Sequence, residues 1–109
     1  MEIEKEKIQE MQLIEQNLQN IILQKQGFQI ELTETENAIN EINKSGEEVY
    51  KIIGQLMIKS EKNSVLGELK SKQRMIELRI KAMEKQEKSF SDKLEILRNE
   101  VIKKLNKDK

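Results

Sequence analysis

The residue types that most enzymes use for catalysis are scarce in this sequence. It contains no cysteine and no histidine, which excludes thiol and imidazole catalysis and the usual ligand sets of zinc sites. The remaining candidates are carboxylates: Asp92 and Asp108 are the only aspartates, and Glu84 and Glu87 lie one helical turn apart. Two carboxylates act as an acid–base pair only where a desolvated pocket separates their pKa values. We interpret this pair as part of a solvated helix face.

Other forms of small-molecule chemistry also lack support. The four glycines do not form a glycine-rich loop that could hold a phosphate. The elements predicted below, two helices and one hairpin, leave no cavity of substrate size. We therefore predict that the protein is not an enzyme, and we expect no cofactor and no metal.

The composition is typical of long helices. Of the 109 residues, 37% are charged, 36% are hydrophobic and 3% are aromatic, and there is no proline. Glu, Lys, Gln, Leu and Ile are strong or acceptable helix formers. The longest apolar runs span three residues, too short to cross a membrane, and the charged N-terminus is unlike a signal peptide. We expect one domain, residues 1–109, located in the cytoplasm and without a membrane contact.

Two long stretches carry an apolar residue at alternating steps of three and four. The first seam comprises Met11, Ile14, Leu18, Ile21, Lys25, Phe28, Leu32, Thr35, Ile39 and Ile42. The second comprises Leu66, Leu69, Gln73, Ile76, Ile80, Met83, Glu87, Phe90, Leu94, Leu97, Val101 and Lys104. A stripe with a 3.5-residue period keeps facing one partner helix. The pattern predicts helices over about 2–44 and 63–106.

The charge distribution favours pairing of these two helices within the chain. Residues 1–44 contain nine acidic and four basic residues, whereas residues 61–109 contain nine acidic and fourteen basic ones. Helices of similar length and opposite charge, joined by a short connection, are typical of an antiparallel coiled coil. A turn near Gly54 makes facing residue numbers sum to about 108, so we expect Glu4 opposite Lys104, Lys25 near Glu87, and Thr35 opposite Gln73.

The connection predicts a β-hairpin over about 47–60. Two runs with β-branched and aromatic residues, 49–53 and 56–59, are separated by Gly54 and Gln55. Gly46 suits the left-handed position after a helix end. Ser60, Asn63 and Ser64 are alternative caps for the second helix.

The hairpin cannot be stable by itself. A two-stranded sheet is marginal in water, and this one has two unpaired edges and apolar side chains on both faces. It either folds back on the coiled coil or pairs with other chains. We favour assembly, because the end of a two-helix coiled coil is too narrow to cover both faces.

The hairpin and the residues after it resemble a known family. Residues 49–59, VYKIIGQLMIK, resemble the hairpin motif of the prefoldin β subunit, and residues 68–87 resemble the start of its second helix. The single hairpin favours the β type over the α type, which has two. The resemblance implies a mainly α fold, a long antiparallel two-helix coiled coil with a central β-hairpin.

The function that this resemblance implies is that of an ATP-independent chaperone, a holdase. Two α-type and four β-type prefoldin chains join through their hairpins into a hexamer with six projecting arms. The arm tips hold unfolded client proteins and deliver them to a group II chaperonin.

We assign two sets of candidate residues. The hairpin set for oligomerisation is Val49, Tyr50, Ile52, Ile53, Gly54, Leu56, Met57 and Ile58. The tip set for client binding consists of apolar residues near both termini, where exposed apolar surface could hold unfolded segments. Its members are Ile3, Ile8, Met11, Ile102 and Leu105.

Two other functions are weighed against this one. A structural coiled-coil adaptor or tether explains the heptads equally well, but it explains the hairpin and the apolar tips less well. A nucleic-acid binder would use the basic second half, yet Phe28, Tyr50 and Phe90 are not interleaved with basic residues as stacking platforms require. We expect no nucleic-acid partner.

Overall fold

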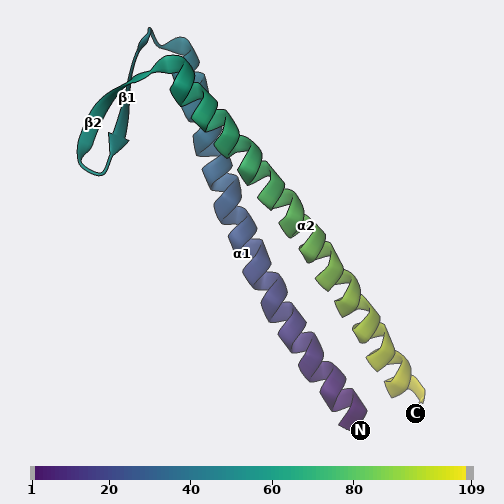
Figure 1. Cartoon of the computed structure of the whole chain (residues 1–109). Helices are drawn as coiled ribbons and strands as arrows, with labels where there is room; N and C mark the ends of the chain where they lie inside the picture. The colour runs from purple at the N-terminus through teal and green to yellow at the C-terminus, as the bar shows by residue number, and fades with distance from the viewer. Residues whose placement is uncertain (1, 108–109) are drawn as a thin grey trace. The chain divides into compact units, whose positions relative to one another are not determined.

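Two long helices and one hairpin make up the chain. The computed structural model describes residues 2–107, with side chains from residue 4 onward. Helix α1 (Glu2–Lys44) is followed by strands β1 (Glu48–Ile53) and β2 (Leu56–Glu61) and by helix α2 (Lys62–Lys107) (Figure 1). The predicted fold class is therefore confirmed: it is mainly α, with two long helices joined by a two-stranded antiparallel hairpin.

The chain divides into two compact units, which are described separately. The terminal unit comprises Met1–Gln26 and Lys81–Lys109, and the hairpin unit comprises Gly27–Ile80. In each unit a segment of α1 packs against a segment of α2. The hairpin unit also contains both strands.

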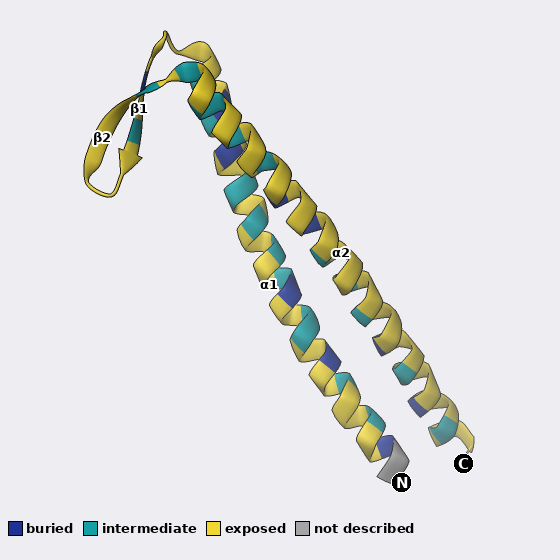
Figure 2. Cartoon of the chain, viewed as in Figure 1, coloured by how far each residue is buried: buried dark blue, intermediate teal, exposed yellow. Residues whose placement is uncertain are grey.

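The predicted seam forms the core of each unit. Every seam position is buried or half-buried, from Met11 to Lys25 and Met83 to Lys104 in the terminal unit and from Phe28 to Ile42 and Leu66 to Ile80 in the hairpin unit. These positions recur as blue and teal bands along both helices (Figure 2). Even the best-buried side chains stay slightly accessible, with Thr35 at 3% and Ile76 at 4% exposure, because a helix with one partner buries only one stripe.

Ion pairs confirm the predicted antiparallel register in the terminal unit. Lys104 Nζ lies 3.5 Å from Glu4 Oε1, and Lys25 Nζ lies 2.8 Å from Glu87 Oε2. In the hairpin unit, Lys72 Nζ lies 3.5 Å from Glu31 Oε1. The hydroxyl of the buried Thr35 donates to the Glu31 carbonyl at 2.8 Å, so it is satisfied within its own helix. Its placement opposite Gln73 stays a prediction.

The two predictions for the helix ends were wrong. Gly46 does not adopt a left-handed conformation, since Gly54 is the only described residue with a positive φ. Ser45 ends α1 instead: its N–H donates to the Glu41 and Ile42 carbonyls at 3.1 and 3.2 Å, and its hydroxyl donates to Ile42 at 2.8 Å. These bonds satisfy terminal carbonyls without a left-handed residue. At the other end, α2 begins directly after β2, so Glu61 precedes its first residue and none of the three proposed caps does.

The hairpin turn has the predicted two residues, Gly54 and Gln55, between the paired Ile53 and Leu56. Gly54 has a φ of 62°, and it is the first residue of the turn. A positive φ at this position only is typical of a type II′ turn, whose twist matches that of the strands. A side chain at Gly54 would meet no neighbour, so its requirement is one of backbone conformation.

We expect opposite effects from Gly54→Ala and Gly27→Ala, which both add one methyl group to open space. The first forces alanine to a positive φ that L-residues avoid, at a cost of about 1–3 kcal/mol. The second replaces a glycine inside α1 and should stabilise the helix by about 0.5–1 kcal/mol. Native-state hydrogen exchange of the hairpin and helix amides measures each change. Equal hairpin protection in Gly54→Ala and the original chain would contradict the assigned turn.

Candidate functional site

The strand register divides the hairpin side chains between two faces. Residues directly opposite one another point to the same side of a two-stranded sheet. The Val49 face contains the pairs Val49–Ser60, Lys51–Ile58 and Ile53–Leu56. The Tyr50 face contains the pairs Glu48–Glu61, Tyr50–Lys59 and Ile52–Met57. Apolar side chains therefore occupy both faces, as predicted, and they concentrate toward the turn.

Almost all of the predicted hairpin residues are exposed. The apolar ones with 43 to 69% of their surface accessible are Tyr50, Ile52, Ile53, Leu56, Met57 and Ile58. Val49 differs, because it is only 7% exposed and has little surface left for a partner to cover, in contrast to our expectation for it. Each strand also has an unpaired edge, since the sheet consists of β1 and β2 alone.

Polar contacts hold the base of the hairpin without covering its apolar part. Lys51 Nζ lies 2.7 Å from Glu68 Oε2 of α2, and Lys59 Nζ lies 3.7 Å from Glu48 Oε1. Lys62 Nζ donates to the Ser45 carbonyl at 3.0 Å. These groups are largely exposed, and such pairs contribute at most about 1 kcal/mol each. Sequence reasoning missed Lys51. Because alternate residues of a strand share a face, the sequence does place Lys51 on the same face as Val49 and Ile53.

The terminal unit carries most of the predicted tip residues on its surface. Ile8, Ile102 and Leu105 are 44, 50 and 53% exposed. Met11 is half-buried in the seam, and the side chain of Ile3 lies outside the described part of the chain. A shallow basic hollow is lined by Lys7, Glu100, Lys103, Lys104 and Lys107. Lys7 and Glu100 form an ion pair across it, with 2.9 Å between Nζ and Oε2.

Exposed apolar residues are not confined to the tip. In the terminal unit, Leu13, Leu23 and Ile96 are 58 to 65% exposed, whereas Ile22 is half-buried. On the helices of the hairpin unit, Ile30, Met75 and Leu78 are 60 to 67% exposed. Sequence reasoning missed Met75. This residue directly precedes the seam residue Ile76 and is not a seam position itself, so the pattern predicts that it is exposed.

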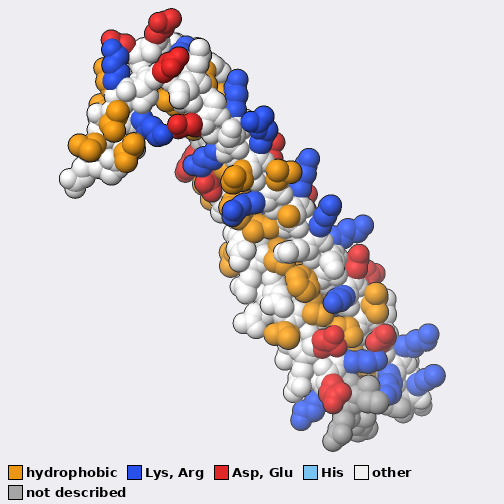
Figure 3. All heavy atoms as spheres, viewed as in Figure 1, with side chains coloured by type: hydrophobic (Ala, Val, Ile, Leu, Met, Phe, Trp, Pro, Cys, Tyr) orange, Lys and Arg blue, Asp and Glu red, His pale blue; other side chains and the backbone are white. Residues whose placement is uncertain are grey.

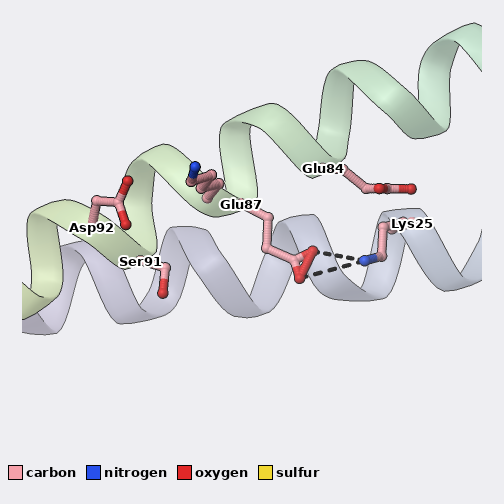
Figure 4. A pocket seen from close by; sticks show the side chains of 6 residues that line it. Lys25, Glu84, Glu87, Ser91 and Asp92 are labelled. Carbon is pink, nitrogen blue, oxygen red and sulfur yellow. Dashed lines mark hydrogen bonds and ion pairs between the residues drawn. The ribbon is translucent and has the colours of Figure 1, made fainter.

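Within the terminal unit, an ion pair with acidic neighbours interrupts the seam. Lys25 Nζ donates to both carboxylate oxygens of Glu87, at 2.8 and 3.4 Å (Figure 4). Glu84, Ser91 and Asp92 line the adjoining hollow. The hydrogen bond from Lys25 to Glu87 raises the pKa of Lys25, and the nearby charges of Glu87 and Glu84 add to this effect. Glu84 is exposed, as interpreted, but Glu87 belongs to the seam.

This arrangement does not resemble a catalytic site. The carboxylate of Glu87 is neutralised by Lys25, and the hollow beside it is open to solvent. Among the described residues, no group of three or more Asp, Glu, His or Cys side chains is placed to hold a metal ion. The features left to explain are therefore surfaces, namely the hairpin and the exposed apolar residues of the terminal unit.

Comparison with known proteins agrees with this architecture. The family model described as prefoldin subunit matches residues 5–108. The chain belongs to the prefoldin subunit family. A prefoldin subunit beta from Thermococcus onnurineus is 43% identical over 89 residues, covering 80% of this chain and 77% of the relative. Another from Thermococcus kodakarensis is 37% identical, covering 84% and 80%.

A solved prefoldin structure has the same fold. The crystal structure of the prefoldin beta subunit from Thermococcus strain KS-1 superposes with a TM-score of 0.85 at 35% sequence identity. The match covers 90% of this chain and 88% of that one. Prefoldin subunits are chaperones and not enzymes, so the surfaces described above belong to a chaperone subunit. In the described part of this prefoldin chain, neither helix is apolar enough along its length to cross a membrane.

The Lys25–Glu87 pair should stabilise the terminal unit only as a complete pair. Lys25→Met leaves the half-buried Glu87 carboxylate without its cation, which is costly, whereas replacing both residues by methionine restores an apolar seam. We therefore expect the single variant to have the lowest urea midpoint, and the double variant to equal or exceed the original chain. Circular dichroism at 222 nm measures all three.

The pH dependence of the same variants provides a control. Because the pKa of Lys25 is raised above its ordinary value of 10.5, the stabilisation is complete below pH 10.5 and is lost as the pH rises through the raised value. The double variant should lack this alkaline loss. A single variant as stable as the original chain at neutral pH would contradict the role of the pair.

Proposed function

We propose that this prefoldin chain is a holdase subunit that assembles through its hairpin and binds non-native proteins at the apolar end of the terminal unit. The uncovered hairpin carries this proposal. Its exposed apolar side chains lie on both faces, beside two unpaired strand edges, and such a sheet is stable only when other strands cover it. The partners are α-type prefoldin chains and further β copies, in a hexamer of two α and four β subunits.

Client binding uses the exposed side chains of Ile8, Ile102 and Leu105, together with Met11 when the helix ends open. Each contact with an unfolded segment is weak, and several arms on one platform multiply its effect. The chaperone acts in the cytoplasm without ATP and transfers its clients to a group II chaperonin. A structural adaptor or tether without client binding is the alternative, and the experiments below separate the two.

The hairpin interface is tested by Ile53→Lys. This substitution places an uncompensated charge on the Val49 face next to Leu56, where assembly would bury it. We expect subunit affinity to fall by at least roughly a hundredfold, giving monomers on size-exclusion chromatography with unchanged helical circular dichroism. Gln55→Lys adds the same charge to the turn and serves as the matched control. Full assembly of the Ile53→Lys chain would show that the hairpin is not the interface.

Client binding at the tip is tested with Ile8→Gln, Ile102→Gln and Leu105→Gln in one chain. Glutamine keeps helix propensity and length but removes the apolar surface, so the assembly should persist while protection of an aggregating client falls severalfold. Light scattering of thermally denatured citrate synthase measures that protection. The control chain carries Ile30→Gln, Met75→Gln and Leu78→Gln, three positions of the hairpin unit that are even more exposed than the tip residues. If both triple variants protect as well as the original chain, the clients bind elsewhere; if no form of the assembly protects, the adaptor reading stands.

A further inference from the structure

The two helices of the terminal unit have very different surfaces. Between residues 11 and 26 of α1, only Glu15 and Lys25 are charged, and Lys25 is engaged with Glu87 in the seam. Between residues 81 and 98 of α2, the charged residues are Lys81, Glu84, Lys85, Glu87, Lys88, Asp92, Lys93, Glu95 and Arg98. On the visible side, the middle of this α1 segment is mostly white with isolated orange side chains, while blue and red side chains follow α2 and also gather at the lower end of the unit (Figure 3). The scarcity of charge is thus confined to residues 11–26 of α1, since residues 2–10 of the same helix carry six charged residues.

The uncharged surface of α1 forms one continuous face. Its members occupy the three heptad positions opposite the seam, and all of them are exposed. We call this the amide face, and it consists of Gln12, Leu13, Gln16, Gln19, Asn20 and Leu23. The seam residues of the same stretch, Ile14, Leu18 and Ile21, are buried or half-buried. The amide face is therefore not needed for pairing with α2.

The spacing of its leucines argues against another helix as the partner. A packed helix requires an apolar residue at every third or fourth position, but Leu13 and Leu23 are ten residues apart with polar residues between them. They lie about 15 Å apart along the axis and about 80° apart around it. A second copy of α1 would bury these amides while covering only two leucines, so little apolar area would offset the desolvation. An extended polypeptide spans the same distance in about five residues, so apolar side chains of one unfolded segment can reach both leucines.

The amide side chains fit the backbone of such a segment. Each glutamine or asparagine offers both a hydrogen-bond donor and an acceptor, and it can pair with the exposed N–H and C=O groups of a chain that lacks secondary structure. Covering the face desolvates no ionised group, whereas covering the corresponding face of α2 would remove several charges from water. An uncharged segment can therefore cover this face of α1 without removing charge from water, which the corresponding face of α2 does not allow.

We propose that the amide face of α1 is a second client-binding surface, which takes uncharged, extended segments of unfolded polypeptide whose apolar residues contact Leu13 and Leu23. The proposal rests on the holdase function proposed above, and it extends binding beyond the tip set. Contacts along α1 let one client occupy the tip and the helix face together, which increases its residence time through avidity.

The decisive variant converts the amide face into a charged one without a change in net charge. Gln12→Glu, Gln16→Lys, Gln19→Glu and Leu23→Lys place each glutamate four residues before a lysine, an arrangement that favours the helix. A milder form carries only Gln19→Glu and Leu23→Lys. Its matched control on α2 carries Ser89→Glu and Ile96→Lys, which also exchange one exposed apolar residue, 58% accessible compared with 65% for Leu23, for a balanced pair of charges.

Binding is measured on the assembled protein with fluorescently labelled, reduced and carboxymethylated α-lactalbumin, which stays unfolded. We expect the fourfold variant to raise the dissociation constant roughly tenfold and the double variant roughly threefold, while the α2 control changes it less than the double variant does. Size-exclusion chromatography should give the same assembly for all of them. A benzoylphenylalanine crosslinker at Gln16 should label the client more strongly than one at Ser89.

Each other outcome overturns the proposal in a recognisable way. If the fourfold variant binds the client with unchanged affinity while the tip variant loses affinity, the amide face is not a client-binding surface, and the holdase function stands. Crosslinks from Gln16 to a second copy of this chain, together with a smaller assembly of the fourfold variant, assign the face to packing between copies. Absence of binding by the original chain removes the holdase function and the amide face together.

Discussion

Each long helix of this chain has only one other helix to pack against, and this constraint governs the rest of the structure. A helix with a single partner buries one narrow stripe. The buried isoleucines and leucines of that stripe, such as Ile14, Ile76 and Leu94, each contribute about 1.5–3 kcal/mol. Most other described positions of both helices are exposed to water. The seam therefore leaves the chain with an unusually large surface for its length, and the composition of that surface decides what the protein can bind.

The hairpin shows the same constraint in a different element. Both helices of its unit are occupied with each other, and among the apolar side chains of the described hairpin only Val49 is buried. Its polar contacts to α2, Lys51–Glu68 above all, are surface ion pairs of small energy. Two strands without a covering layer do not reach independent stability in water. In the assembly proposed above, partner strands satisfy these edges and cover the exposed side chains near the turn, which offsets this local deficit.

Polar groups inside the seam and on the surface have different roles. In the terminal unit, Glu4–Lys104 and Lys25–Glu87 interrupt the seam with opposite charges at matching heights. Such layers fix the register of a coiled coil at some cost in stability. Outside the seam, residues 81–98 of α2 carry many charges, while residues 11–26 of α1 carry mainly amides. The asymmetry leaves one helix face on which an uncharged chain could bind without desolvating ions.

The sequence by itself determined the helices, their seam and the site of the hairpin. These are local signals. Apolar residues at steps of three and four predict the helices, and two β-branched runs separated by Gly54 and Gln55 predict the hairpin. It also placed Lys25 near Glu87, because an antiparallel pair fixes the sum of facing numbers. The structure was needed to locate the helix ends, since Ser45 closes α1 with local hydrogen bonds to Glu41 and Ile42 that no propensity predicted, and α2 begins directly after β2. It likewise decided that Val49 is buried while Ile53 is exposed: both residues are β-branched and share one face, and only the distance from the base of the hairpin separates them.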